Sequence, residues 1–349
     1  MKAAIRMKPT SDSAAGPEPT PAAPMIANPV GHRRWLMRLV VVMGSLLVAS
    51  VLAELVLTFF FPDRFAVFED ERSLLYRYHP TLGWFPIPNS RDRFMASRAI
   101  NVENNSAGFR APEWTPGQKP GLLVLGDSFV WGFDVEAPER FTEKLQARHP
   151  DWNLFNLGVS GYGTDQEFLL LQQQFDRHQP KVVFLVFCVE SDLDDNRTNL
   201  RYGRYYKPYF TEAGGRLVLQ GVPVPRSERV FLAEHEQLAR SCVVQLLAGA
   251  WFGVITPPVI HNPDPSAAII DEMQKYVRSK GAVLCVGLTR SHPPLEEFLH
   301  RSEIPFVDLS TTLRYAAFGA HWTPEGHSFV CGLIDNFLGK QTLWTAKAQ

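Results

Sequence analysis

Four short polar blocks in this sequence contain the residue types that acyl transfer by a serine requires. Such chemistry needs a nucleophile, a base within hydrogen-bond reach, donors for the developing oxyanion and a group that orients the base. Ser128 is the candidate nucleophile, and His321 is the candidate base because imidazole titrates near neutral pH. Asp127, next to the nucleophile, is a candidate substrate contact. The blocks cover residues 126–129, 156–163, 189–196 and 319–327.

These side chains need a scaffold that brings them together. Ser128 follows a run of Leu and Val at 121–125, which is typical of a central strand of a parallel sheet. Ligands of such sheets bind in the crevice beyond the carboxyl ends of the strands. We therefore predict an α/β fold with a doubly wound, flavodoxin-like parallel sheet of about five strands flanked by helices. The predicted strands cover 122–125, 153–157, 182–187, 282–287 and 306–309, and the main predicted helices cover 138–148, 164–178, 265–279 and 324–338.

The blocks, taken in this order, resemble the motif blocks of the SGNH/GDSL hydrolase superfamily. The elements Leu-Gly-Trp at 82–84 and Asn-Ser-Ala-Gly-Phe-Arg at 105–110 resemble the lead-in of its membrane-anchored bacterial members, so the resemblance spans roughly 82–338. It implies that Ser128 is the nucleophile and His321 the general base. It also implies that the backbone N–H groups of Ser128 and Gly158 face the oxyanion, and that neither a metal nor another cofactor takes part. His327, on the final helix, is interpreted as structural.

The third block departs from the pattern of that family. An asparagine that donates to the oxyanion usually stands there, and the aligned residue in this sequence is Ser191. A serine hydroxyl donates over a shorter reach, and losing one oxyanion donor costs on the order of 10²–10³ in rate. Asn196 is a nearby alternative donor.

A second departure concerns the group that orients the base. The family usually places an aspartate two or three residues before the histidine, where this sequence has Gly319 and Phe318. Changing the aspartate of a serine-protease triad lowers turnover by about 10⁴. A backbone carbonyl, Glu325 or Asp308 is left as the orienting group, and we expect a slow site.

Composition excludes several other classes of protein. The chain has 349 residues, of which 45% are hydrophobic and 20% charged, as in ordinary globular proteins. A formal net charge of −1 provides no basic field for nucleic acid. The four cysteines have no CxxC spacing, and Cys188 and Cys285 lie in apolar runs where a thiol behaves as a small hydrophobe. We expect no zinc site.

The N-terminal part predicts a membrane anchor. Residues 1–34 are rich in Pro, Ala and Ser and predict a disordered cytoplasmic tail, and 35–61 are almost wholly apolar. Roughly 20 residues cross the ~30 Å hydrocarbon layer. Basic residues precede the run, so the N-terminus stays in the cytoplasm and the rest is periplasmic, at a bacterial inner membrane. The alternative is a cleaved signal peptide, which we disfavour because the apolar run continues past the small residues at 49–53.

The remaining chain divides into a connector at 62–117, packed on the following domain, and an SGNH-hydrolase-like domain at 118–340. An insertion at about 197–262 interrupts that domain. Within it, the basic and aromatic stretch 201–209 is either a loop packed by its own tyrosines or a sugar platform that includes Tyr202 and Tyr205. The apolar run 242–260 contains glycines and a Pro-Pro pair, which favour a packed or interfacial helix over a second membrane span.

The sequence thus predicts an acyl-ester hydrolase or acyltransferase that acts on O-acylated envelope carbohydrate or a related ester. Hydrolysis and transfer share one acyl-enzyme, so the residues do not separate them. One alternative is a catalytically degenerate relative that binds a glycan or an envelope partner without turnover. Another is a structural component of an envelope assembly, because fold alone does not decide function.

Overall fold

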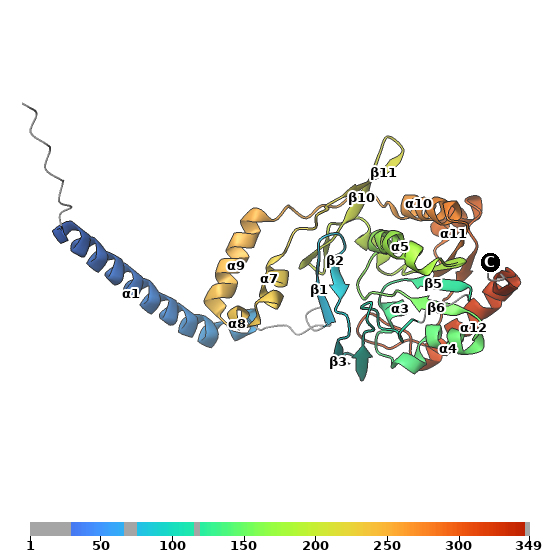
Figure 1. Ribbon diagram of the computed structural model, residues 1–349, viewed down its shortest axis with the longest axis horizontal. Coiled ribbons are helices and arrows are strands. Elements are labelled where there is room, and N and C mark those ends of the chain that lie inside the picture. The colour runs from blue at the N-terminus through green and yellow to red at the C-terminus, as the bar shows by residue number, and fades with distance from the viewer. Residues whose placement is uncertain (1–28, 66–74, 115–118, 346–349) are drawn as a thin grey trace, which may run out of the picture. The chain divides into compact units, whose positions relative to one another are not determined.

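The computed structural model describes residues 29–65, 75–114 and 119–345 (Figure 1). The chain divides into two compact units, Met1–Val56 and Leu57–Gln349. Residues 1–28 of the predicted tail (1–34) lie outside the described residues. Helix α1 (Pro29–Phe60) follows, and its stretch Arg33–Phe60 has a mean hydropathy of 2.5, long and apolar enough to cross a membrane. A signal sequence has the same properties, so the anchor remains a proposal.

A five-stranded parallel sheet forms the centre of the second unit. Its order is β13-β12-β7-β5-β6, so the first strand of the domain lies between the second and the third. This is the flavodoxin-like order, with its switch point between β5 and β7. The predicted doubly wound sheet is confirmed. The strands are β5 (Gly121–Leu125), β6 (Asn153–Asn156), β7 (Val182–Phe187), β12 (Val283–Leu288) and β13 (Phe306–Asp308).

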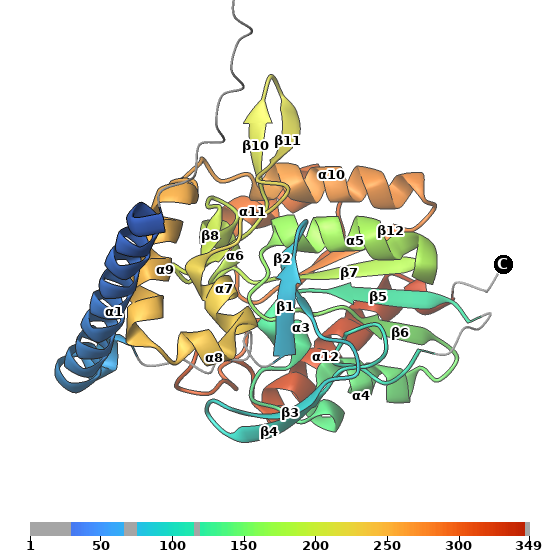
Figure 2. The same ribbon diagram turned by 60° about the vertical axis from the view of Figure 1, so that its left-hand side comes forward.

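Helices cover both faces of the sheet, so every residue of β5 and β7 is buried. Figure 2 shows α5 and α10 on one face and α4 and α12 on the other. Alternate side chains of β5 belong to two separate apolar cores, as the period of a strand requires. The helices are α4 (Phe141–Arg148), α5 (Thr164–His178), α10 (Ser266–Ser279), α11 (Pro293–Arg301) and α12 (Pro324–Lys340).

The segment ahead of the sheet forms two antiparallel hairpins, β1 with β2 and β3 with β4. Leu82, Trp84 and Phe109 from this segment are fully or almost fully buried in the first core. The connector predicted at 62–117 therefore contains regular structure within its described residues. The strands are β1 (Tyr76–His79), β2 (Gly83–Pro86), β3 (Arg91–Met95) and β4 (Ala99–Glu103).

The inserted segment follows β7 and a short helix. It begins with small antiparallel pairs, β8 with β9 and β10 with β11, and continues with three helices that share a small apolar cluster. Its elements are β8 (Leu200–Arg201), β9 (Tyr205–Tyr206), β10 (Tyr209–Ala213), β11 (Arg216–Gln220), α7 (Glu228–Glu234), α8 (Glu236–Ala239) and α9 (Cys242–Ile255). The remaining short helices are α3 (Ser128–Trp131), α6 (Asp192–Asp195) and the 3₁₀ turns η1 (Pro62–Arg64), η2 (Ala137–Glu139) and η3 (Leu343–Thr345).

Candidate active site

Ser128 and His321 come from opposite ends of the domain sequence and meet beyond the carboxyl end of β5. Ser128 is the first residue of α3, directly after the turn that ends the strand, and its side chain is partly exposed. The Oγ atom of Ser128 lies 2.7 Å from Nε2 of His321. This distance is within hydrogen-bond reach, and it joins the predicted nucleophile to the predicted base.

The backbone around His321 fixes the position of its ring. The Tyr315 N–H donates to the His321 carbonyl at 2.8 Å, and the Thr323 N–H donates to the Leu313 carbonyl at 3.0 Å. Thr323 then caps α12 by accepting from the Gly326 N–H. The imidazole stacks on Phe133, with ring centroids 4.3 Å apart. The ring is therefore held by packing and by a closed backbone loop.

The surroundings of His321 keep its imidazole neutral. Burial lowers its pKa from about 6.5 to about 4, and the nearby Phe318 carbonyl opposes this shift only in part. Nδ1 makes no well-formed hydrogen bond to any residue in the described part of the chain. A neutral imidazole can accept the Ser128 proton. Among the described residues no carboxylate accepts a hydrogen bond from Nδ1, and the more distant Glu190 is the one carboxylate whose charge favours the cation that then forms.

The two acidic residues that we considered as orienting groups are engaged elsewhere. Glu325 is exposed in the first turn of α12, where a backbone N–H and Thr323 lower its pKa. Asp308 accepts from the backbone N–H and the hydroxyl of Ser310, at 2.8 and 2.5 Å. Of the groups named from the sequence, the backbone carbonyl of Phe318 is the one that lies near the ring.

The predicted oxyanion donors differ in their availability. The Ser128 N–H makes no hydrogen bond to the residues that the structure describes. In contrast, the Gly158 N–H donates to Oδ1 of Asn156 at 2.9 Å, so this donor is engaged in the present conformation and its role toward the oxyanion stays a prediction. A Cβ at position 158 would lie 2.6 Å from the Val130 carbonyl carbon, so glycine is required there for packing against α3.

The third donor is a serine side chain. Ser191 precedes α6, and its Oγ atom is buried without a hydrogen bond to the described residues. Asn196 cannot replace it, because its amide donates to Ser266 at 2.9 Å and its carbonyl oxygen accepts from the Asp165 N–H. The backbone N–H of Ser128 and the hydroxyl of Ser191 are therefore the candidate oxyanion donors that make no hydrogen bond to the described residues.

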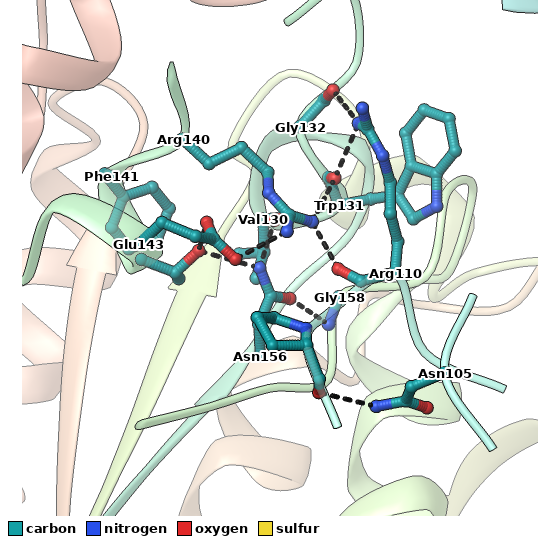
Figure 3. A network of polar contacts seen from close by, with 12 residues as sticks. Asn105, Arg110, Val130, Trp131, Gly132, Arg140, Phe141, Glu143, Asn156 and Gly158 are labelled. Carbon is teal, nitrogen blue, oxygen red and sulfur yellow. Dashed lines mark hydrogen bonds and ion pairs between the residues drawn. The ribbon is translucent and has the colours of Figure 1, made fainter. Parts of the chain in front are cut away.

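Two buried arginines hold the chain that follows the nucleophile (Figure 3). The guanidinium of Arg110 donates to the Gly132 carbonyl at 2.6 Å. It also donates to the Val135 carbonyl at 2.8 Å. Arg140 donates to the Arg110 carbonyl and pairs with Glu143 at 2.5 Å. Burial and the neighbouring Arg140 lower the pKa of Arg110 to about 9. We call Arg110 and Arg140 the arginine clamp, because between them they bind the carbonyls at the end of α3.

The three residues predicted to contact substrate, Asp127, Tyr202 and Tyr205, have different environments in the structure. Asp127 is buried and caps α3 by accepting from the Phe129 N–H at 2.9 Å, so it is a structural residue here. Tyr205 is buried in the first core beside Trp84, which excludes it from a surface sugar platform. Tyr202 is exposed on a turn, with the guanidinium of Arg201 over its ring at 4.2 Å. The loop interpretation of this stretch therefore fits better than the sugar platform.

Two residues that the sequence reasoning passed over border the dyad. Arg314 lies over the Phe129 ring at 5.1 Å and pairs with Glu190 at 2.8 Å. Its charge lowers the pKa of His321, whereas Glu190 raises it. The second missed residue is Phe133, which stacks on the imidazole. Neither stands in a motif block, so no spacing signal identifies them.

His327 is fully buried and accepts from the Phe141 N–H at 3.3 Å through Nδ1. Its role is structural in this arrangement. The polar blocks named from the sequence thus gather beyond the carboxyl ends of neighbouring strands of the flavodoxin-like sheet.

Comparisons with known proteins find similarity to solved structures. No protein-family profile and no curated protein matches the sequence. Similar solved structures include TesA (13% identity, TM-score 0.37, covering 63% of this chain and 98% of that one) and the psychrotrophic esterase EstA from Pseudoalteromonas sp. (8%, 0.37, 64% and 99%). Another is a lipolytic protein of the G-D-S-L family from Veillonella parvula (10%, 0.35, 62% and 96%).

Proposed function

We propose that this protein is a serine-dependent acyl-ester hydrolase or acyltransferase with Ser128 as nucleophile and His321 as general base. The observation that carries the proposal is the 2.7 Å separation of Ser128 Oγ and His321 Nε2. A partly exposed serine hydroxyl in contact with a buried, neutral imidazole is the arrangement that activates an oxygen nucleophile.

In the proposed reaction, Ser128 Oγ attacks the ester carbonyl carbon while its proton passes to His321 Nε2. The carbonyl oxygen becomes an oxyanion, for which the Ser128 N–H and the Ser191 hydroxyl are the available donors. The intermediate collapses by breaking the bond to the alcohol oxygen, which takes the proton from Nε2. A water or a second hydroxyl then attacks the acyl carbon and gives its proton to Nε2. The bond between the acyl carbon and Ser128 Oγ breaks, and Oγ takes the proton back from Nε2. Attack by water gives hydrolysis, and attack by a second hydroxyl gives transfer.

Among the described residues, no carboxylate accepts a hydrogen bond from Nδ1 of the imidazolium formed in this cycle. The Phe318 carbonyl favours the charged ring, and burial opposes it more strongly. We therefore propose a Ser–His dyad assisted by a backbone carbonyl, slower than a full triad. Its proposed substrate is an O-acylated envelope carbohydrate or a related ester, met by a periplasmic domain that α1 anchors to the inner membrane.

Fluorophosphonate labelling of the full chain tests this proposal. The probe phosphonylates an activated serine, so we expect labelling of the unchanged protein and none of Ser128→Ala. His321→Ala, which keeps the nucleophile and removes the base, should label far more slowly. Ser328→Ala, at an exposed serine on α12, serves as the matched control and should label normally. Labelling that survives Ser128→Ala, or its absence from the folded unchanged protein, would refute the dyad.

A second candidate function is binding of a glycan or an envelope partner without turnover. The engaged Gly158 N–H and the missing carboxylate favour it. Hydrolysis of p-nitrophenyl acetate separates the two candidates: a rate above background that disappears in Ser128→Ala supports the enzyme, and equal rates in both proteins support the binding protein.

A further inference from the structure

Helix α9 presents an apolar face to the outside of the second unit. Its 14 residues include no charged side chain. Leu247, Trp251 and Val254 have exposed fractions of 63, 63 and 81%, and their spacing of four and three residues places them on one side of the helix. Leu246 and Ile255 extend the same exposed face. So large an apolar surface marks an interaction site.

The opposite side of α9 fixes the helix to the body of the insertion. Ala248 is buried with Leu232 of α7 and Ala239 of α8. Phe252 packs on Phe231 of α7, with ring centroids 5.7 Å apart. These contacts already occupy the inward side, so the helix cannot turn its apolar face toward the core.

A hydrogen bond ties α9 to the point where the chain leaves the apolar stretch Arg33–Phe60. The side-chain amide of Gln245 donates to the Phe65 carbonyl at 3.1 Å. Both residues belong to the second compact unit. If α1 spans a membrane, α9 lies at the end of the domain that first emerges from it.

The length and the charge of this region indicate how α9 meets a bilayer. At about 1.5 Å per residue a helix of this length reaches about 21 Å, less than the ~30 Å of hydrocarbon, so it cannot span. Behind it lies a pocket of about 350 Å³, whose lining includes Arg64, Arg204, Arg229 and Glu228. With three arginines and one glutamate, the lining of this pocket has a net positive charge, which attracts anionic lipid headgroups.

We propose that α9 lies in the headgroup region of an anionic phospholipid bilayer, with Leu247, Trp251 and Val254 inserted among the acyl chains. The domain is then held at the membrane by two elements: the N-terminal span and an in-plane helix. The inference rests on the apolar face of α9 and its link to Phe65, and it is independent of the Ser128 chemistry.

Spin-label accessibility in the full chain tests this placement. The four native cysteines are buried, so the unchanged protein supplies the labelling background. A nitroxide is attached to Val254→Cys and, as the matched control, to Phe329→Cys, an exposed apolar position on α12. Both proteins are placed in nanodiscs of phosphatidylcholine with phosphatidylglycerol. The collision rates of each label with oxygen and with a water-soluble nickel chelate are then measured.

We expect the label at 254 to show an oxygen-to-nickel ratio several-fold higher than the label at 329, because oxygen concentrates in lipid and the chelate does not. The ratio at 254 should fall in phosphatidylcholine alone and fall further in Val254→Cys with Leu247→Glu. Equal ratios at 254 and 329 would overturn the proposal. Protection from both reagents would also overturn it, since protein would then cover the face, either α1 of the same chain or a second copy.

Discussion

At the residue scale, the feature that distinguishes this site is a base supported by backbone instead of by a carboxylate. Phe318, Gly319 and Ala320 all have positive φ values, of 51, 86 and 52°. This left-handed turn brings the main chain against the imidazole of His321. A Cβ at position 319 would lie 2.9 Å from Cε1 of the ring. Gly319 stands where the hydrolases that the sequence resembles usually have an aspartate. The main chain approaches the His321 ring so closely there that a side chain would collide with it.

The pH dependence of activity should reveal how the base is held. His321 must be neutral to accept the Ser128 proton, and burial lowers its pKa to about 4. The acid limb of kcat/KM should thus lie near pH 4, with activity lost below that value as the ring becomes charged. Profiles with an uncharged ester measure it. Phe133→Ala, which opens the stacked face, should move the limb toward the ordinary value near 6.5. A limb near 6.5 in the unchanged protein would contradict the buried position of the ring.

Gly319→Ala tests the close approach of the turn to the imidazole. The new methyl group meets Cε1 at 2.9 Å in a backbone conformation with φ of 86°, so the ring must move away from Ser128. Misplacement by about 1 Å costs about 10²-fold in rate. Gly281→Ala is the matched control, because φ there is 75° and a Cβ meets no atom within 4 Å. The kcat/KM of the control should stay near that of the unchanged protein. Equal losses in both variants would show that backbone strain, not contact with His321, is responsible.

At the scale of elements, α3 has only four residues and needs support from outside itself. Its end is held by the arginine clamp, in which Arg110 and Arg140 bind main-chain carbonyls at and after Trp131. Both side chains are buried, so their charges depend on these partners. The clamp thereby holds the main chain that connects Ser128 to Phe133, the ring that stacks on His321.

Removing one arm of the clamp should destabilise the fold. Arg140→Met removes the cation paired with Glu143, the donor to the Arg110 carbonyl and one of the two donors to the Trp131 carbonyl. Removing one partner of a buried ion pair costs about 3–5 kcal/mol. The control is Arg91→Met, whose pair with Glu103 is largely exposed and worth about 0–1 kcal/mol. Urea unfolding of the two variants measures the difference. A loss in Arg140→Met no larger than in the control would mean that the clamp does not support α3.

Some helices and strands could be predicted from the sequence, and others could not. The strand at 182–187 and the helix at 164–178 match β7 and α5, because a continuous apolar run and a helical apolar period are strong signals. The two hairpins ahead of the sheet were missed, since four or five residues give too little pattern. At the site, the structure places the predicted pair Ser128 and His321 next to each other. The capture of the Gly158 N–H by Asn156 and the burial of Tyr205 depend on packing between distant segments, which one sequence does not display.

At the scale of the whole molecule, the insertion is part of the α/β body. Lys207, fully buried, pairs with Asp165 at the start of α5, and Arg201 pairs with Asp195 of α6. The two ends of the insertion are joined where the Asn262 N–H donates to the Arg197 carbonyl at 2.8 Å. Loosening the insertion should therefore affect the helices that follow β6 and β7, beside the site.

A double-mutant cycle on Asp165 and Lys207 measures this connection. Asp165→Asn removes the carboxylate that is paired with the buried Lys207 ammonium. Lys207→Met removes the ammonium and leaves the buried Asp165 carboxylate without this partner. Each single variant should therefore lose about 3–5 kcal/mol of unfolding free energy. The double variant removes both charges and should lose less than the sum of the single losses. Urea unfolding gives the three values, and limited proteolysis shows whether cleavage within 197–262 rises in the single variants. Additive losses would indicate that the pair is not coupled, and the insertion would then be fixed to the domain by its other contacts, which include the Arg201–Asp195 pair and the backbone hydrogen bond of Asn262.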